Sequence, residues 1–158
     1  MPESYLIYLH TTRQPDDEAV SIAGIIGGEV GEDGNGETSV NRRDRSGASW
    51  VGGEVTRNTF NELRDEYWEP QATDAYSVYF RIRGDRSVLE DETARIFDEL
   101  VKGRPDTPML LTHNLDLMDA SYLPGRGVKH FPGGVSIYAE AEPVWRKWPV
   151  RQGEDEFQ

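Results

Sequence analysis

Alternating hydrophobic and polar residues predict a strand, a helix and a second strand over residues 75–114. Apolar side chains occupy every second position of the first of these strands: Tyr76, Val78, Phe80 and Ile82. A period of two is typical of a half-buried strand. Apolar residues then recur at helical spacing over residues 89–100, behind Ser87 and Glu90 at the spacing of a capping box. The short apolar run 109–113 predicts the second strand.

The N-terminal part of the chain predicts another strand followed by a helix. Residues 4–11 are apolar on both faces of the expected strand, which is typical of an inner strand. Asp16 is the predicted N-cap of a helix that ends before Gly27. The two strand–helix units together predict an α+β fold, in which a mixed or antiparallel sheet carries its helices on one face in a split βαβ-like arrangement.

The remaining segments carry weaker patterns. Residues 27–37 are glycine-rich and acidic and predict a flexible loop, and residues 115–129 predict a second loop. Further strands are predicted at 38–41, 49–56 and 135–140. We therefore expect a single domain over residues 1–150 and an acidic C-terminal tail over residues 151–158.

Composition narrows the class of protein. The chain has 158 residues, no cysteine and a net charge of −12. The absence of cysteine excludes disulfides, thiolate metal sites and a cysteine nucleophile. No apolar segment reaches the roughly 20 residues of a membrane span, and the N-terminus lacks the pattern of a signal peptide, so we expect a cytoplasmic protein.

The negative charge also bears on partners. Nucleic acids and anionic membranes repel such a chain, whereas a basic protein is attracted to it, so we expect no nucleic-acid or membrane partner. An acidic surface that mimics DNA is an alternative, but the scattered arginines disfavour it.

Motifs that would identify a reaction or a cofactor are absent. The glycine-rich stretch 27–36 has neither the lysine of a phosphate-binding loop nor the spacing of a dinucleotide-binding loop. Asp33, Asn35 and Glu37 begin like a calcium loop, but Thr38 stands where that loop requires glycine. There is no zinc-binding HExxH and no GxSxG motif. We expect no enzymatic activity, no cofactor and no metal.

Three histidines leave one alternative open. They are His10, His113 and His130, and none has a partner at metal-binding spacing. His10 and His113 both fall near predicted strand ends and could be neighbours there. The alternative function is therefore a small-molecule-binding or hydrolytic domain that uses His10, His113 and nearby carboxylates.

Three clusters of basic residues stand out in this acidic chain. The clusters are Arg42, Arg43 and Arg45; Arg81, Arg83 and Arg86; and Arg146 and Arg151 with Lys147. We expect them to pair mainly with the protein's own carboxylates, while binding of an anionic ligand is the alternative.

An acidic stripe is the candidate partner-binding surface. Its four members are spaced i, i+3, i+4 and i+7 on a predicted helix: Glu62, Asp65, Glu66 and Glu69. Like charges at this spacing mildly destabilise an isolated helix, which favours a role in recognition. Trp68 beside them is a candidate aromatic anchor.

The order of elements resembles that of the Sit-type swarming-inhibition immunity proteins of bacterial polymorphic toxin systems. The resemblance is carried by residues 4–12 and the helix after them, then by residues 78–83, the following helix and residues 104–111. It implies a protein that performs no chemistry and neutralises a cognate toxin by binding it directly. The partner is then that toxin or another basic protein.

Overall fold

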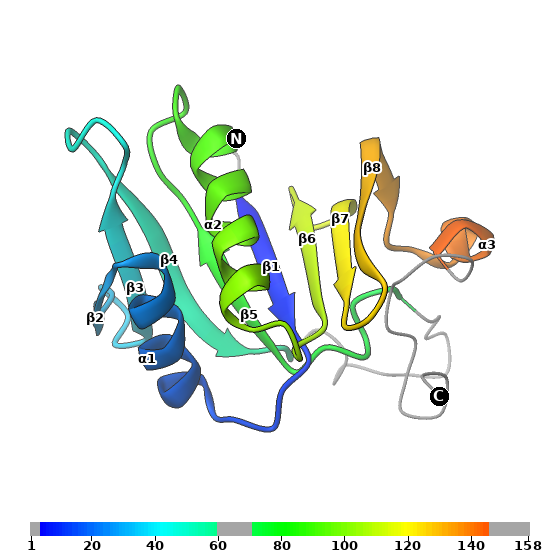
Figure 1. Ribbon diagram of the computed structural model, residues 1–158, viewed down its shortest axis with the longest axis horizontal. Helices are drawn as coiled ribbons and strands as arrows, with labels where there is room; N and C mark the ends of the chain where they lie inside the picture. Colours follow the sequence, from blue (N-terminus) through cyan, green and yellow to red (C-terminus); the bar gives the residue numbers. More distant parts are fainter. Residues whose placement is uncertain (1–3, 60–70, 146–158) are drawn as a thin grey trace.

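Eight strands are present in the computed structural model of the chain, which describes residues 4–59 and 71–145. They are β1 (Tyr5–Leu9), β2 (Glu29–Glu32), β3 (Thr38–Arg43), β4 (Trp50–Arg57), β5 (Val78–Ile82), β6 (Met109–His113), β7 (Leu117–Leu123) and β8 (Gly127–Ser136). They form one sheet in the order β2-β3-β4-β5-β1-β6-β7-β8, in which every neighbouring pair is antiparallel. Figure 1 shows this sheet with the two longer helices in front.

The central strand is β1, which pairs with β5 on one side and β6 on the other. All five of its residues are buried. Ile7 packs with the core beneath the helices, whereas Leu6 and Tyr8 belong to a second cluster on the opposite face. Burial of both faces confirms the prediction of an inner strand, because only a strand covered on both sides keeps a continuous apolar run.

Two longer helices, α1 (Pro15–Ile26) and α2 (Leu89–Gly103), lie on one face of the sheet. Their apolar stripes join one core cluster with side chains of β1, β3, β4, β5 and β6, and α1 lies over β3 and β4. The predicted caps are wrong. Gln14 precedes α1, and Asp16 instead accepts a hydrogen bond from the Thr38 hydroxyl. Ser87 donates to Asp85 and does not cap α2, which leaves Glu90 without the predicted capping partner.

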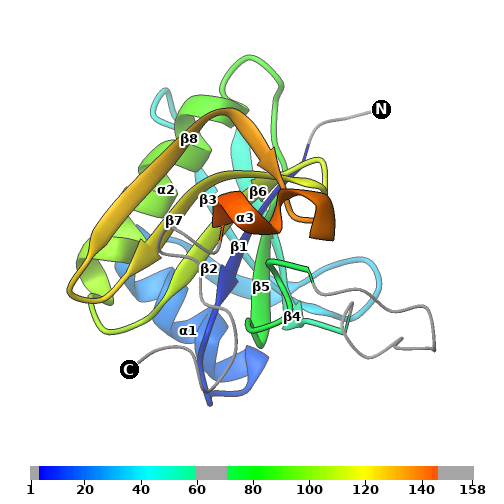
Figure 2. The same ribbon diagram turned by 90° about the vertical axis from the view of Figure 1, so that its right-hand side faces the viewer.

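The opposite face of the sheet is covered by chain segments that contain little regular structure. Residues 71–77 lie there, together with the short helices η1 (Ala139–Ala141) and α3 (Glu142–Trp145) that follow β8. Figure 2 shows α3 on this side of the molecule. The Asn58 side chain donates to the carbonyls of Thr73 and Tyr76 at 3.0 and 2.9 Å, and it thereby fastens the segment to the end of β4.

The predicted fold class is wrong. Two strand–helix units were expected to form the sheet, but they supply only β1, β5 and β6, and the sheet is more extensive than that prediction allows. Of its other strands, β3 and β4 correspond to the predicted strands at 38–41 and 49–56, whereas β2, β7 and most of β8 were not predicted. Strands at the edges of a sheet hydrogen-bond without burying alternate side chains, so their sequences carry no strong apolar period.

Two predicted loops contain strands: β2 is an edge strand, whereas β7 lies inside the sheet and is mostly buried, with a bulge that interrupts its alternation. Residues 27–37 contain β2, an edge strand whose four side chains are all exposed, and the turn into β3. Residues 115–129 contain β7 and the start of β8. The predicted last strand at 135–140 ends earlier, because β8 stops at Ser136.

Arg42, Arg81 and Arg83 pair with the protein's own carboxylates, as predicted for their clusters, whereas Arg43 lies over the Trp50 ring. Arg42 of β3 is buried and contacts Glu92 and Glu99 of α2 at 3.0 and 2.6 Å. Arg81 and Arg83 both lie beside Glu54 of β4, at 3.2 and 3.7 Å. These pairs tie the sheet to α2 and β4 to β5. The third predicted cluster lies outside the described residues.

Candidate functional site

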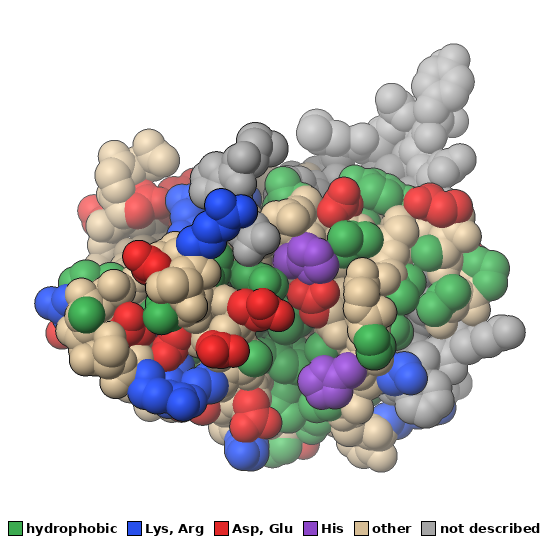
Figure 3. Space-filling model, turned by 90° about the horizontal axis from the view of Figure 1, so that it is seen from above, with side chains coloured by type: hydrophobic (Ala, Val, Ile, Leu, Met, Phe, Trp, Pro, Cys, Tyr) green, Lys and Arg blue, Asp and Glu red, His purple; other side chains and the backbone are tan. Residues whose placement is uncertain are grey.

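A cleft of about 640 Å³ opens between α2 and the strands β6, β7 and β8. Its volume falls in the range of ligand-binding pockets. In Figure 3 the two histidines and several acidic side chains surround a hollow with hydrophobic side chains at its bottom. The residues that line it are Tyr5, Glu90, Thr93, Ala94, Phe97, Asp98, Leu111, His113, Asn114, Asp119, Ala120, Val128, His130 and Gly133.

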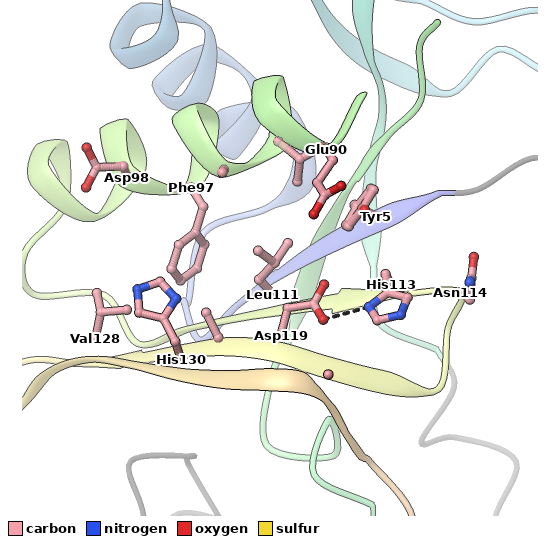
Figure 4. Close-up of a pocket in the computed structure, with 14 residues that line it drawn as sticks. Tyr5, Glu90, Phe97, Asp98, Leu111, His113, Asn114, Asp119, Val128 and His130 are labelled. Carbon is pink, nitrogen blue, oxygen red and sulfur yellow. Dashed lines mark hydrogen bonds and ion pairs between the residues drawn. The ribbon is translucent and has the colours of Figure 1, made fainter. Parts of the chain in front are cut away.

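A cross-strand row forms the floor of the cleft. Leu111 of β6 is opposite Ala120 of β7, which is in turn opposite His130 of β8. The Phe97 side chain points from α2 into the cleft toward this row (Figure 4). Leu111, Ala120 and Phe97 are all buried, so the floor is apolar.

A β-bulge in β7 places an acid in the cleft. The pairing between β6 and β7 shifts register between Leu111 and Thr112, and Asp119 has no direct partner on either neighbouring strand. A bulge adds an unpaired residue and redirects its side chain. As a result Asp119 reaches the same face as His113, and its Oδ1 lies 2.7 Å from the imidazole Nδ1 (Figure 4).

Opposing influences act on the Asp119 carboxyl. Partial burial raises its pKa, the adjacent His113 imidazole lowers it, and the negative charge of Glu90 raises it again. The net effect is a raised pKa. The cleft is therefore a costly place for the Asp119 negative charge, and a cation bound there would remove part of that cost.

Glu90 stands on the opposite wall of the cleft. Figure 4 shows its carboxylate pointing down from α2 toward Asp119. Nothing among the described residues forms a hydrogen bond or ion pair with the Glu90 side chain. Asp98 lies nearer the C-terminal end of α2. Its side chain points away from Asp119 and is paired with Lys102 at 2.9 Å. None of the described residues that line the cleft is a lysine or arginine, so the site is acidic.

A buried hydroxyl lies in the same wall. Thr93 of α2 is 1% exposed, and its Oγ1 has no hydrogen-bond partner among the described residues. Buried polar groups normally find a partner, so an unsatisfied one beside a cleft is a free acceptor for a ligand. Thr93 thus adds a neutral acceptor to the two carboxylates.

The hypothesis of neighbouring His10 and His113 is wrong. β1 and β6 are antiparallel, with Tyr5 opposite His113 and Leu9 opposite Met109, so the two histidines lie at opposite ends of the sheet. His10 Nδ1 is 2.9 Å from the Ala75 carbonyl, a structural contact. His113 instead contacts Asp119 and shares the cleft with His130, and sequence reasoning missed this because β7 and most of β8 were predicted as loop or left unassigned.

The predicted partner-binding residues lie outside the described part of the chain. They are Glu62, Asp65, Glu66, Trp68 and Glu69. Within residues 4–59 and 71–145, no group of three or more histidine and acidic side chains is arranged to hold a metal ion.

No helix in the described ranges combines the length and the apolarity that crossing a membrane requires. No family model, curated protein or solved structure matches the chain.

Proposed function

We propose that this chain is a non-enzymatic binding protein of the cytoplasm, and that it is an immunity protein which neutralises a cognate toxin by direct contact. The observation that carries the proposal is the cleft, which presents the carboxylates of Glu90 and Asp119 and has no lysine or arginine among its described lining residues. Such a site favours a basic segment of a partner protein. The net charge of −12 supports the same partner class by attracting it from a distance.

The cleft suits a protein partner better than an anionic one. Phosphate or carboxylate ligands would approach the Glu90 and Asp119 carboxylates with no cation in the lining to offset the repulsion. Its apolar floor, by contrast, matches the methylene stems of basic side chains, which bury their carbon chain and keep the charged end among polar groups.

Charge reversal at the rim tests the proposal. The proteins encoded by the genes flanking this one are expressed, and each is titrated with the chain by isothermal titration calorimetry. We expect one basic protein to bind, and Glu90→Lys to weaken that binding at least about tenfold, because like charges across an interface are costly. Asp91→Lys is the matched control, since Asp91 is exposed on the same turn of α2 but does not line the cleft.

Two results would contradict the proposal. One is the absence of binding to every flanking product. The other is equal weakening by the Glu90 and Asp91 replacements, which would show that total charge matters and the cleft does not.

The acidic stripe remains a separate prediction for the position of the interface. Lysine replacement of Glu62, Asp65, Glu66 and Glu69 is expected to slow association with the same partner, most strongly at low salt, if the stripe steers the encounter. Stopped-flow fluorescence measures the rate. If the association rate is unchanged while Glu90→Lys weakens binding, the stripe is not part of the interface and the cleft is.

A second function is favoured by one observation, the contact between His113 and Asp119. A carboxylate at Nδ1 orients an imidazole and leaves its Nε2 available for proton transfer. Hydrolysis of p-nitrophenyl acetate and of bis(p-nitrophenyl) phosphate tests this function. A rate above buffer that His113→Gln abolishes and His10→Gln keeps would favour an enzyme, while no such rate favours the binding protein.

A further inference from the structure

We infer that the cleft between α2 and strands β6–β8 is a binding site for a guanidinium group on an aliphatic stem, so that the partner inserts an arginine side chain there. This inference rests on the proposed function and narrows it from a basic protein to one recognised functional group. It follows from the placement of Glu90, Asp119, Thr93 and the apolar floor.

Two carboxylates from different elements face the same space. Glu90 reaches in from α2 and Asp119 from the bulge of β7 (Figure 4). Asp119 already accepts one hydrogen bond at Oδ1 from the His113 side, which leaves its second oxygen available. A guanidinium has five N–H donors in a planar fork and can donate hydrogen bonds to both carboxylates at once. The ammonium of lysine is a compact point charge.

An unsatisfied hydroxyl belongs to the lining of the same cleft. Thr93 is buried to 1% exposure and its Oγ1 has no partner in the described part of the chain. A planar group with spare N–H donors would supply one. This observation is independent of the acidic side chains, and it points to a ligand that donates more hydrogen bonds than two carboxylates require.

The floor fits the stem and the flat face of the ligand. Leu111, Ala120 and Phe97 form an apolar surface below the carboxylates. The rings of Phe97 and His130 lie at one end of the cleft in Figure 4. Arginine stacks on aromatic rings more readily than lysine does, and its three methylene groups bury against apolar side chains.

The acidic lining of the cleft disfavours anionic ligands. Among the described lining residues, acids are not offset by lysine or arginine. Asp98 is engaged by Lys102, so the carboxylates directed at the ligand are those of Glu90 and Asp119. One guanidinium between these two carboxylates offsets one of their negative charges and can hydrogen-bond to both of them.

The experiment uses the full chain and three small probes. N-acetyl-arginine amide is titrated by ¹H–¹⁵N NMR at pH 8, where imidazoles are generally uncharged. N-acetyl-lysine amide replaces the guanidinium with an ammonium, and N-acetyl-citrulline amide keeps its shape without the charge. We expect saturable shifts of cleft amides with the arginine probe and a dissociation constant on the order of 1 mM, as suits a ligand of this size. The lysine probe is expected to bind several-fold more weakly, and citrulline to give no saturation.

Variants locate the contact. Glu90→Gln is expected to weaken arginine binding about tenfold, and Asp91→Asn on the exposed side of the same helix is expected to leave it unchanged. Glu90 forms no hydrogen bond or ion pair among the described residues, so its replacement does not threaten the fold. Asp119→Asn provides a second test, once thermal denaturation shows that the variant is folded.

Several outcomes would overturn the guanidinium site. They are the absence of saturable shifts at cleft amides, equal binding of arginine and lysine probes, or equal effects of the Glu90 and Asp91 replacements. If the arginine probe fails but the basic partner still binds and is weakened by Glu90→Lys, this inference falls and the proposed function stands. If the arginine probe binds as expected and no flanking product does, the cleft takes a small guanidinium compound and the proposed function falls.

Discussion

Replacing Arg42 with alanine is expected to lower the free energy of unfolding by about 3–5 kcal/mol, the cost of breaking a buried ion pair. The Arg42 guanidinium is 8% exposed and contacts Glu92, Glu99 and the Ile26 carbonyl at 3.0, 2.6 and 3.1 Å. Its removal leaves the Glu92 carboxylate buried between β3 and α2 with only part of its partners. Chemical denaturation followed by circular dichroism measures the loss.

Arg43 provides the matched control on the next position of β3. Its guanidinium lies 4.2 Å from the centre of the Trp50 ring, and that ring is 45% exposed. Arg43→Ala is therefore expected to cost about 1 kcal/mol or less, the scale of an exposed cation–π contact. Equal losses for the two arginines would show that the buried network contributes nothing beyond a surface contact. The double replacement of Arg42 by Met and Glu92 by Leu is expected to recover most of the loss, because it leaves no unpaired buried charge.

Acid should weaken the same network. Burial alone would raise the pKa of Glu92, but hydrogen bonds from the Arg45 amide and the Arg42 guanidinium, with the charges of Arg95 and Arg42, hold it below its ordinary value of 4.5. A lowered pKa in the folded state adds stability that is complete above the unfolded value and disappears as the pH falls through the folded one. Stability is therefore expected to fall as the pH drops below about 4.5, less steeply in Arg42→Ala. Denaturation series at several pH values check the slope, and equal slopes would contradict the assignment.

Replacing Gly52 with alanine is expected to lower the free energy of unfolding by about 3 kcal/mol or more, from backbone strain and a steric clash together. Gly52 has a φ of 145°, a conformation that residues with a side chain rarely adopt. An added Cβ would lie 2.0 Å from the Val40 carbonyl oxygen on β3. At this residue β4 is paired with Asn41 of β3 and exchanges two backbone hydrogen bonds with Arg83 after β5. The substitution therefore disrupts β4 between its two neighbours.

Gly34 in the turn between β2 and β3 is the control for that substitution. An added Cβ there meets nothing within 4 Å, and its φ is not in the left-handed region. Gly34→Ala is expected to change stability by less than about 1 kcal/mol. Thermal denaturation of the two variants in parallel makes the comparison, and similar midpoints would show that the close approach of β3 to Gly52 is not a constraint on the fold.

Periodicity in the chain correctly located the elements at the centre of the fold. The apolar alternation over residues 76–82 corresponds to β5, the stripe over 89–100 to α2, and residues 5–9 to β1. These segments can be predicted from the sequence because each buries a face against the same core, and burial imposes a period of two or of 3.6 residues on the sequence. The pairing of the Arg42 and Arg81 clusters with acids was also predictable, since an arginine buried in an acidic protein requires a counter-charge.

Which side chains meet in the cleft depends on the tertiary structure. Nothing in the local sequence marks the register shift that turns Asp119 toward His113, because a bulge is a property of the pairing between strands. The direction of β6 relative to β1 likewise separated His10 from His113 and left His130 as the histidine that shares the cleft. Side-chain alternation can be read along one strand, but which side chains from distant strands share a face depends on strand order and register, and these are set when the whole sheet assembles.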